Sequence, residues 1–164
     1  MPLSLEDIQH LEAAENWLER KHFDNCFEEL QRINSSHRED PRELALRWKL
    51  FDGSEQHGPA AHLARVIQWR FPHEPAGYLW RAISLRKLGC TREAHDEVAR
   101  VVDKFDGLGT VPYLAAVLAA ELQQMNKAWH WLERAFATEN GKELKLQALE
   151  EKALEPFWRR IEAL

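Results

Sequence analysis

A spacing of 34 residues governs the apolar pattern of this sequence, and it constrains the fold more than any other feature. Four units begin at Asp7, Pro41, Pro75 and Gly109, and no insertion interrupts them. The twentieth residue of every unit is small, and the twenty-fourth is apolar. The small residues are Cys26, Ala60, Ala94 and Ala128, and the apolar ones are Leu30, Ala64, Val98 and Leu132. Self-similarity at such a period indicates a protein built from stacked structural repeats.

Each unit has the pattern of two amphipathic helices joined by a short turn. Positions 4, 8 and 11 share one helical face, and positions 20, 24 and 27 share another. Position 8 is alanine in three units and Trp48 in the second. One hairpin cannot bury its apolar stripe alone, so neighbouring units must stack. The expected helices cover residues 4–20, 24–36, 41–53 and 58–71, followed by four that begin near 75, 91, 110 and 126. The expected helix N-caps are Ser4 (with Asp7), Asp24, Thr91 and Asn126.

The pattern resembles the tetratricopeptide repeat, most clearly in the third unit. The matching residues there are Tyr78, Ala82, Leu85, Gly89, Ala94 and Val98. Two departures are Arg47 and Arg81, where the family usually has leucine. The resemblance implies an all-α fold, a right-handed superhelix of four tetratricopeptide-like helix-turn-helix repeats plus C-terminal capping helices. The repeats would cover about 7–40, 41–74, 75–108 and 109–140, and a cap at 142–164 would use Leu144, Leu146 and Leu149.

The resemblance also implies a concave groove lined by the first helix of each repeat. Carried over by position, the C-terminal half of this groove is an apolar strip with one basic residue at its edge, and Lys49 lies further towards the N-terminus. The expected peptide-binding residues are Leu79, Ile83, Arg86, Tyr113, Val117 and Lys49. An apolar strip of this width is expected to be covered by something. The candidates are a partner, the chain's own tail, and a second copy of the chain.

The sequence carries no pattern of a catalytic or metal site. None of the eight histidines forms an HxxxH or HExxH motif, and Cys26 and Cys90 lie far apart. Cys90 precedes a helix, but His95 occupies a repeat position that is apolar in the other units, so a thiol–base pair is not expected. There is no glycine-rich phosphate loop and no nucleophile elbow. We therefore expect neither enzymatic activity nor a cofactor.

Charge and hydropathy exclude further classes. The net charge is −5, and residues 1–40 carry 4 Lys/Arg against 10 Asp/Glu. No basic stripe of the kind that nucleic-acid binding requires is present. No apolar run reaches the length of a membrane span, which is about 18 residues or more. The N-terminus lacks the plan of a signal peptide, so a cytoplasmic location is expected.

The predicted function is that of a non-enzymatic protein–protein interaction module, which binds a peptide or helical segment in the groove. Two alternatives stay open: a self-associating structural or assembly protein, such as a homodimer, and a small secretion-type chaperone of the same repeat class. Trp69, Trp80 and Trp158 are less constrained by the repeat than the other tryptophans. Any of the three that is exposed is a further candidate for binding.

Overall fold

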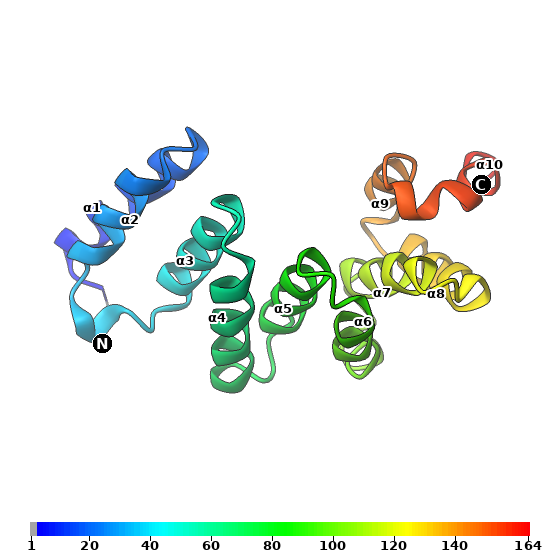
Figure 1. The fold of residues 1–164 in the computed structure, drawn as a ribbon, viewed down its shortest axis with the longest axis horizontal. Coiled ribbons are helices and arrows are strands. Elements are labelled where there is room, and N and C mark those ends of the chain that lie inside the picture. The colour runs from blue at the N-terminus through cyan, green and yellow to red at the C-terminus, as the bar shows by residue number, and fades with distance from the viewer. Residues whose placement is uncertain (1–2) are drawn as a thin grey trace.

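The computed structural model describes residues 3–164, and within them every regular element is a helix (Figure 1). The prediction of an all-α fold is confirmed. The elements, two of them short 3-10 helices, are α1 (Leu5–Glu19), α2 (Phe23–Arg32), η1 (Ser35–His37), α3 (Pro41–Gly53), α4 (His57–Arg70), α5 (Ala76–Lys87), α6 (Thr91–Ala99), α7 (Thr110–Glu121), α8 (Met125–Phe136), α9 (Gly141–Ala148), η2 (Lys152–Phe157) and α10 (Trp158–Glu162).

The helices are arranged along an arc whose two ends rise on the same side (Figure 1). Helices α1 and α2 form one end, and α9 and α10 form the other. Between them α3, α5 and α7 lie towards the opening of the arc, while α4 and α6 lie on its outer side. Each α-helix packs against the next α-helix in the chain from α1 through α9, and α3 also contacts α1.

The small residues predicted at every twentieth position lie in the core. The small residues Cys26, Ala60, Ala94 and Ala128 are all 0% exposed. The apolar residue four positions after each of them is also 0% exposed. A methyl or thiol group at these positions allows the two helices of a pair to approach each other closely. Burial raises the pKa of the Cys26 thiol to about 11, so this cysteine is an inert part of the core.

The four turns inside the helix pairs share one backbone geometry. The residues Lys21, Glu55, Gly89 and Gln123 are spaced by 34 and have positive φ angles of 60°, 61°, 78° and 61°. The amide of the next residue donates in each case to a carbonyl in the last turn of the preceding helix, at 2.8–2.9 Å. This is the Schellman arrangement, which usually has glycine at the left-handed position. Only Gly89 follows that preference.

This turn explains why three predicted N-caps are wrong. The second helix of each pair begins two residues after the left-handed position, so Thr91 is the first helical residue of α6. Asp24 and Asn126 are the second helical residues of α2 and α8. The residues at the four true N-caps make no side-chain capping bond. The prediction for Ser4 is confirmed, since its Oγ accepts a hydrogen bond from the Asp7 amide at 3.1 Å.

Helix α2 ends at Arg32, four residues before the predicted end at residue 36, because the chain turns at the buried, extended residue Ile33. Asp7 fixes the segment that follows. Its carboxylate accepts hydrogen bonds from the Ser4 hydroxyl at 2.6 Å and the Asn34 amide at 2.8 Å, and it lies 2.6 Å from Nδ1 of His37. The hydrogen bonds from Ser4, Asn34 and His37 hold the pKa of Asp7 well below its usual range. Asp7 thus joins the start of α1 to η1.

We expect Asp7→Asn to lower the thermal midpoint at pH 6, with an effect that shrinks as the pH falls. Because the folded-state pKa of Asp7 lies below its unfolded-state value of about 3.9, the unfolded chain binds more protons. The stabilisation is therefore complete above that value and is lost progressively below about pH 4. Circular dichroism melts at pH 6 and pH 2.5 measure this, with exposed Glu6→Gln as the control. If Asp7→Asn lowered the thermal midpoint equally at both pH values, the stabilisation would not come from the charge of Asp7.

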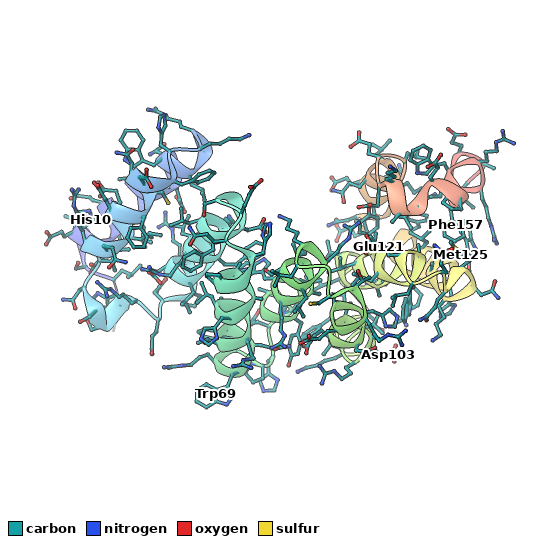
Figure 2. All side chains as sticks on the ribbon, in the orientation of Figure 1. His10, Trp69, Asp103, Glu121, Met125 and Phe157 are labelled. Carbon is teal, nitrogen blue, oxygen red and sulfur yellow. The ribbon has the colours of Figure 1, made fainter. Side chains whose placement is uncertain are left out.

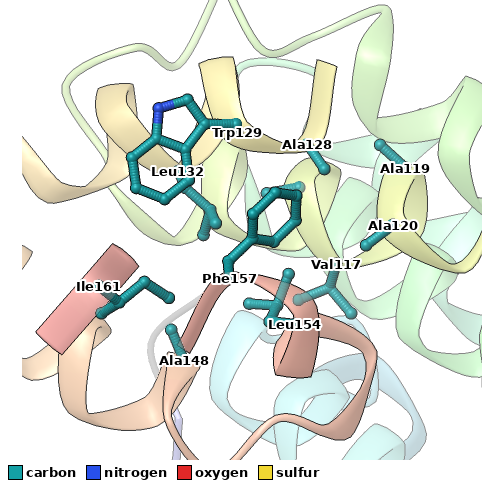
Figure 3. Packing of buried hydrophobic residues seen from close by; sticks show 11 residues of the cluster. Val117, Ala119, Ala120, Ala128, Trp129, Leu132, Ala148, Leu154, Phe157 and Ile161 are labelled. Carbon is teal, nitrogen blue, oxygen red and sulfur yellow. The ribbon is translucent and has the colours of Figure 1, made fainter. Parts of the chain in front are cut away.

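The C-terminal elements close one end of the stack and pack on α7 and α8. Leu154 is 0% exposed, and Ala148, Phe157 and Ile161 are buried in the same cluster. Figure 3 shows Leu154 beside Val117 and Phe157 between the C-terminal segment and Trp129, whose ring centroid is 5.6 Å from that of Phe157. Of the three leucines predicted to form the cap, Leu144 is buried and Leu149 is partly buried, but Leu146 is 67% exposed. The prediction for Leu146 is wrong, because this side chain lies on the solvent face of α9.

Candidate functional site

The concave face is formed by α1, α3, α5 and α7, and the C-terminal segment divides it into a covered part and an open part. Residues 151–157 pass over α7, and Figure 2 places Glu121 and Phe157 on this covered side. The six residues predicted to bind a peptide come from α3, α5 and α7. Three of them, Arg86, Tyr113 and Val117, contact or lie beneath this segment.

Arg86 links α5 to both α7 and the C-terminal segment. Its Nε donates to Glu121 at 2.7 Å, and its two terminal nitrogens donate to the two oxygens of Glu151 at 2.9 and 3.2 Å. Burial disfavours the charge on Glu151, but the hydrogen bonds from Arg86 and from the Ala153 amide outweigh it and lower the pKa of Glu151. A guanidinium that binds two carboxylates in this way is already occupied by groups of its own chain.

Val117 and Tyr113 are covered by the same segment. Val117 is 1% exposed and belongs to the cluster that contains Leu154, and Tyr113 packs against that cluster. Burial, with a further contribution from the charge of Glu151, raises the pKa of Tyr113 to about 12. The chain's own tail therefore occupies the concave face at α7. Val117 could therefore touch a partner only if the tail moved, and its role in binding remains a prediction.

The concave face between α1 and α5 remains open. Leu79 and Ile83 of α5 are half-buried, and Lys49 of α3 is exposed. No carboxylate of residues 3–164 lies within 4.0 Å of the Lys49 ammonium. The neighbouring charges are paired, Arg42 with Glu15 at 2.9 Å and Lys87 with Asp52 at 2.7 Å. The open part thus holds two half-buried apolar residues, two ion pairs and the exposed Lys49, which forms no ion pair among residues 3–164.

Two hollows flank this open part. One, of about 310 Å³, lies where α3 and α5 begin and α4 ends. The other, of about 650 Å³, lies at the opposite ends of the helices, between Leu18, Phe23, Asp52 and Lys87. The first has mainly apolar walls, and the second carries charges of both signs.

One solved structure has the same architecture along nearly the whole chain. It is the crystal structure of a thermophilic tetratricopeptide-repeat protein from Thermus thermophilus, with a TM-score of 0.68. The alignment covers 96% of this chain and 97% of that chain, at 16% sequence identity. The fold is that of a tetratricopeptide-repeat protein. No protein-family model matches the sequence, and no curated protein matches it.

The three tryptophans that the repeat constrains less differ in their surroundings. Trp80 stacks on Trp48, with ring centroids 5.0 Å apart and an interplanar angle of 8°, and the Trp158 indole donates to the Ala148 carbonyl at 2.9 Å. Trp69 is 79% exposed and points away from the concave face (Figure 2). Of the three tryptophans, Trp69 is thus the one that meets the condition of exposure for a further binding candidate.

Other chemistry-bearing groups of the chain stay apart. Cys90 is exposed at the turn before α6, whereas His95 is buried against Trp131. Within residues 3–164, no three His, Cys, Asp or Glu side chains are grouped so that they could hold a metal ion. In the same part of the chain, no helix has the length and apolar character that crossing a membrane requires.

The contact that sequence reasoning missed is the ion pair between Arg86 and Glu151. Glu151 belongs to no repeat, and it lies 65 positions from Arg86. The only relevant signal was the apolar character of Leu154 and Phe157, which indicated a cap but not its position on α7.

Proposed function

We propose that this protein is a non-enzymatic interaction module that binds a short peptide or helical segment on the open part of its concave face. The observation that carries the proposal is that the open part holds the half-buried Leu79 and Ile83 and the exposed Lys49, which forms no ion pair within 4.0 Å among residues 3–164. Apolar contacts provide affinity in such a complex, and an isolated charge selects register and orientation. A ligand with an acidic residue near two apolar ones fits this arrangement.

The covered part of the concave face supports the proposal, because the chain's own tail binds there as we propose that a partner segment binds the open part. There an acidic residue, Glu151, binds a cation of α5, and apolar residues Leu154 and Phe157 of the same short segment pack beside it. The chain thus holds one short segment of its own by the chemistry that we propose for a partner. The alternative of self-association through Tyr113 and Val117 has less support, because the tail covers both residues.

The experiment is a selection of peptides from a random library on the immobilised full-length protein, followed by fluorescence anisotropy. We expect Lys49→Glu and Ile83→Arg each to weaken binding of the selected peptide at least tenfold, which corresponds to about 1.4 kcal/mol. Lys127→Glu makes the same charge change at an exposed site on α8, and it should leave the affinity within about twofold. Equal losses in Lys49→Glu and Lys127→Glu would show a general charge effect and contradict the proposed site.

A further inference from the structure

Two stacked tryptophans lie between α3 and α5, and one of them, Trp80, lines the hollow at the start of these helices. Trp48 occupies the repeat position that is alanine in the other units, and its ring stacks on Trp80 of α5. The indole of Trp48 also donates to the Ser84 hydroxyl at 3.2 Å, which fixes the pair between α3 and α5. The backbones of α3 and α5 approach each other less closely than those of α1 and α3. A gap therefore remains beside the pair.

Apolar side chains form the walls of this gap. Leu44 and Ile67 are 6% and 4% exposed, and Phe71 and Trp80 are half-buried. The volume is about 310 Å³, at the lower limit for ligand pockets. A cavity of that size suits one large apolar side chain rather than a whole cofactor. Ala76, a concave-face position at the start of α5, also lines the hollow, which makes it continuous with the open part of the concave face.

A single carboxylate lies among these walls. Glu74 is exposed, and no Lys, Arg or His nitrogen of residues 3–164 lies within 4.0 Å of its oxygens. The nearest cation in sequence, Arg70, is paired with Glu39. A ligand that carries a positive charge beside its apolar group complements this arrangement, whereas a ligand with a negative charge there is repelled.

We infer that this hollow binds the anchor of a partner segment, an aromatic or large aliphatic side chain followed directly by lysine or arginine. The inference rests on the proposed function, because it names the chemistry of one part of the segment that binds the concave face. Phe71, Leu44, Ile67 and Trp80 contact the apolar side chain, and Glu74 binds the adjacent cation.

Two small probes test the hollow without a selected partner, N-acetyl-Phe-Lys amide and N-acetyl-Phe-Glu amide. NMR on the full-length protein follows the Trp80 indole and the methyl groups of Leu44 and Ile67 during each titration. We expect saturable shifts at these three residues and about fivefold tighter binding of the lysine probe at low salt, as for a pair of opposite charges at an exposed site. NMR contacts between the phenyl ring of the probe and the methyl groups of Leu44 and Ile67 would place the probe in the hollow directly, on the wild-type protein.

Variants separate the two parts of the site. Ala76→Leu fills the hollow and should weaken both probes at least tenfold, while Ala45→Leu makes the same change on α3 outside the hollow and should weaken neither. Glu74→Gln should remove most of the preference for lysine but retain binding. No saturable shift at Trp80, Leu44 and Ile67, or equal affinity for the two probes, would overturn the inference.

Failure of this inference differs from failure of the proposed function. If selected peptides depend on Lys49 and Ile83 but not on Ala76→Leu, the proposed function stands and the anchor site is refuted. If the probes bind as expected while selected peptides ignore Lys49 and Ile83, the hollow is a site and the proposed position of the partner is wrong.

Discussion

Leu154→Ala is expected to lower the free energy of unfolding by about 3 kcal/mol, within the range for a fully buried leucine. Leu154 is 0% exposed and, with Phe157 of the same C-terminal segment, belongs to a buried cluster that includes Val117 and Ala120 of α7. Its truncation leaves a cavity between η2 and α7, which the helices cannot close without moving Phe157. Urea unfolding monitored by circular dichroism measures the change, and the slope with denaturant should stay as in the wild type.

Leu146→Ala is the matched control, since it makes the same change in the same C-terminal region. Leu146 is 67% exposed on α9, so its truncation should change the free energy of unfolding by no more than about 0.5 kcal/mol. Equal small effects of the two variants would mean that η2 does not pack on α7 in solution. In that case Val117 and Tyr113 would be open to a partner.

Arg47→Met is expected to cost about 3 kcal/mol, because it leaves a buried carboxylate without its cation. Glu43 is 0% exposed and bonds to Arg47, which also donates to the Leu30 carbonyl at 3.5 Å. Burial raises the pKa of Glu43, against the opposing effect of Arg47. A raised carboxyl pKa means that the folded state binds more protons, so the unpaired Glu43 is costlier at high pH. The loss in free energy of unfolding caused by Arg47→Met should therefore be smaller at pH 4.5 than at pH 7.5.

The double variant Glu43→Leu/Arg47→Met shows whether the cost comes from the stranded charge. Replacing both members of a buried ion pair by apolar residues is often neutral or stabilising. We expect the double variant to recover most of the stability lost in Arg47→Met, as measured by urea unfolding. A double variant as unstable as the single one would instead indicate that Arg47 acts through its contacts with α2.

The repeat period was sufficient to predict the helix pairs and most of their core. The small residues Cys26, Ala60, Ala94 and Ala128 are fully buried because every pair of helices crosses at the same point. The common turn was harder to predict, because lysine, glutamate and glutamine adopt at three of its four positions a conformation that only Gly89 signals. Because the second helix begins two residues after this turn, Asp24, Thr91 and Asn126 lie inside their helices and not at the N-caps.

The candidate site was predicted only in part, and the reason is the distance between its members in sequence. Lys49 is exposed and Leu79 and Ile83 are half-buried, and their place in a binding site stays a proposal. Arg86 and Val117 occupy equivalent positions but meet Glu151 and Leu154, which belong to no repeat. A periodic pattern describes local faces, and it carries no information about where a non-repetitive tail returns. Arg47 likewise stands where the family usually has leucine, and its side chain donates a hydrogen bond to Glu43, one helical turn earlier.

The most direct test of the account is to map by NMR where a peptide selected on the full-length protein binds. We predict that the largest amide shifts occur at Lys49, Leu79 and Ile83, with little change at residues 151–157, because the C-terminal segment stays in place over α7. Shifts concentrated on the outer side of α4 around Trp69 would contradict the proposed position of the partner. Large shifts throughout residues 151–157 would instead show that the partner replaces the chain's own tail, and that the open part of the concave face is not the site.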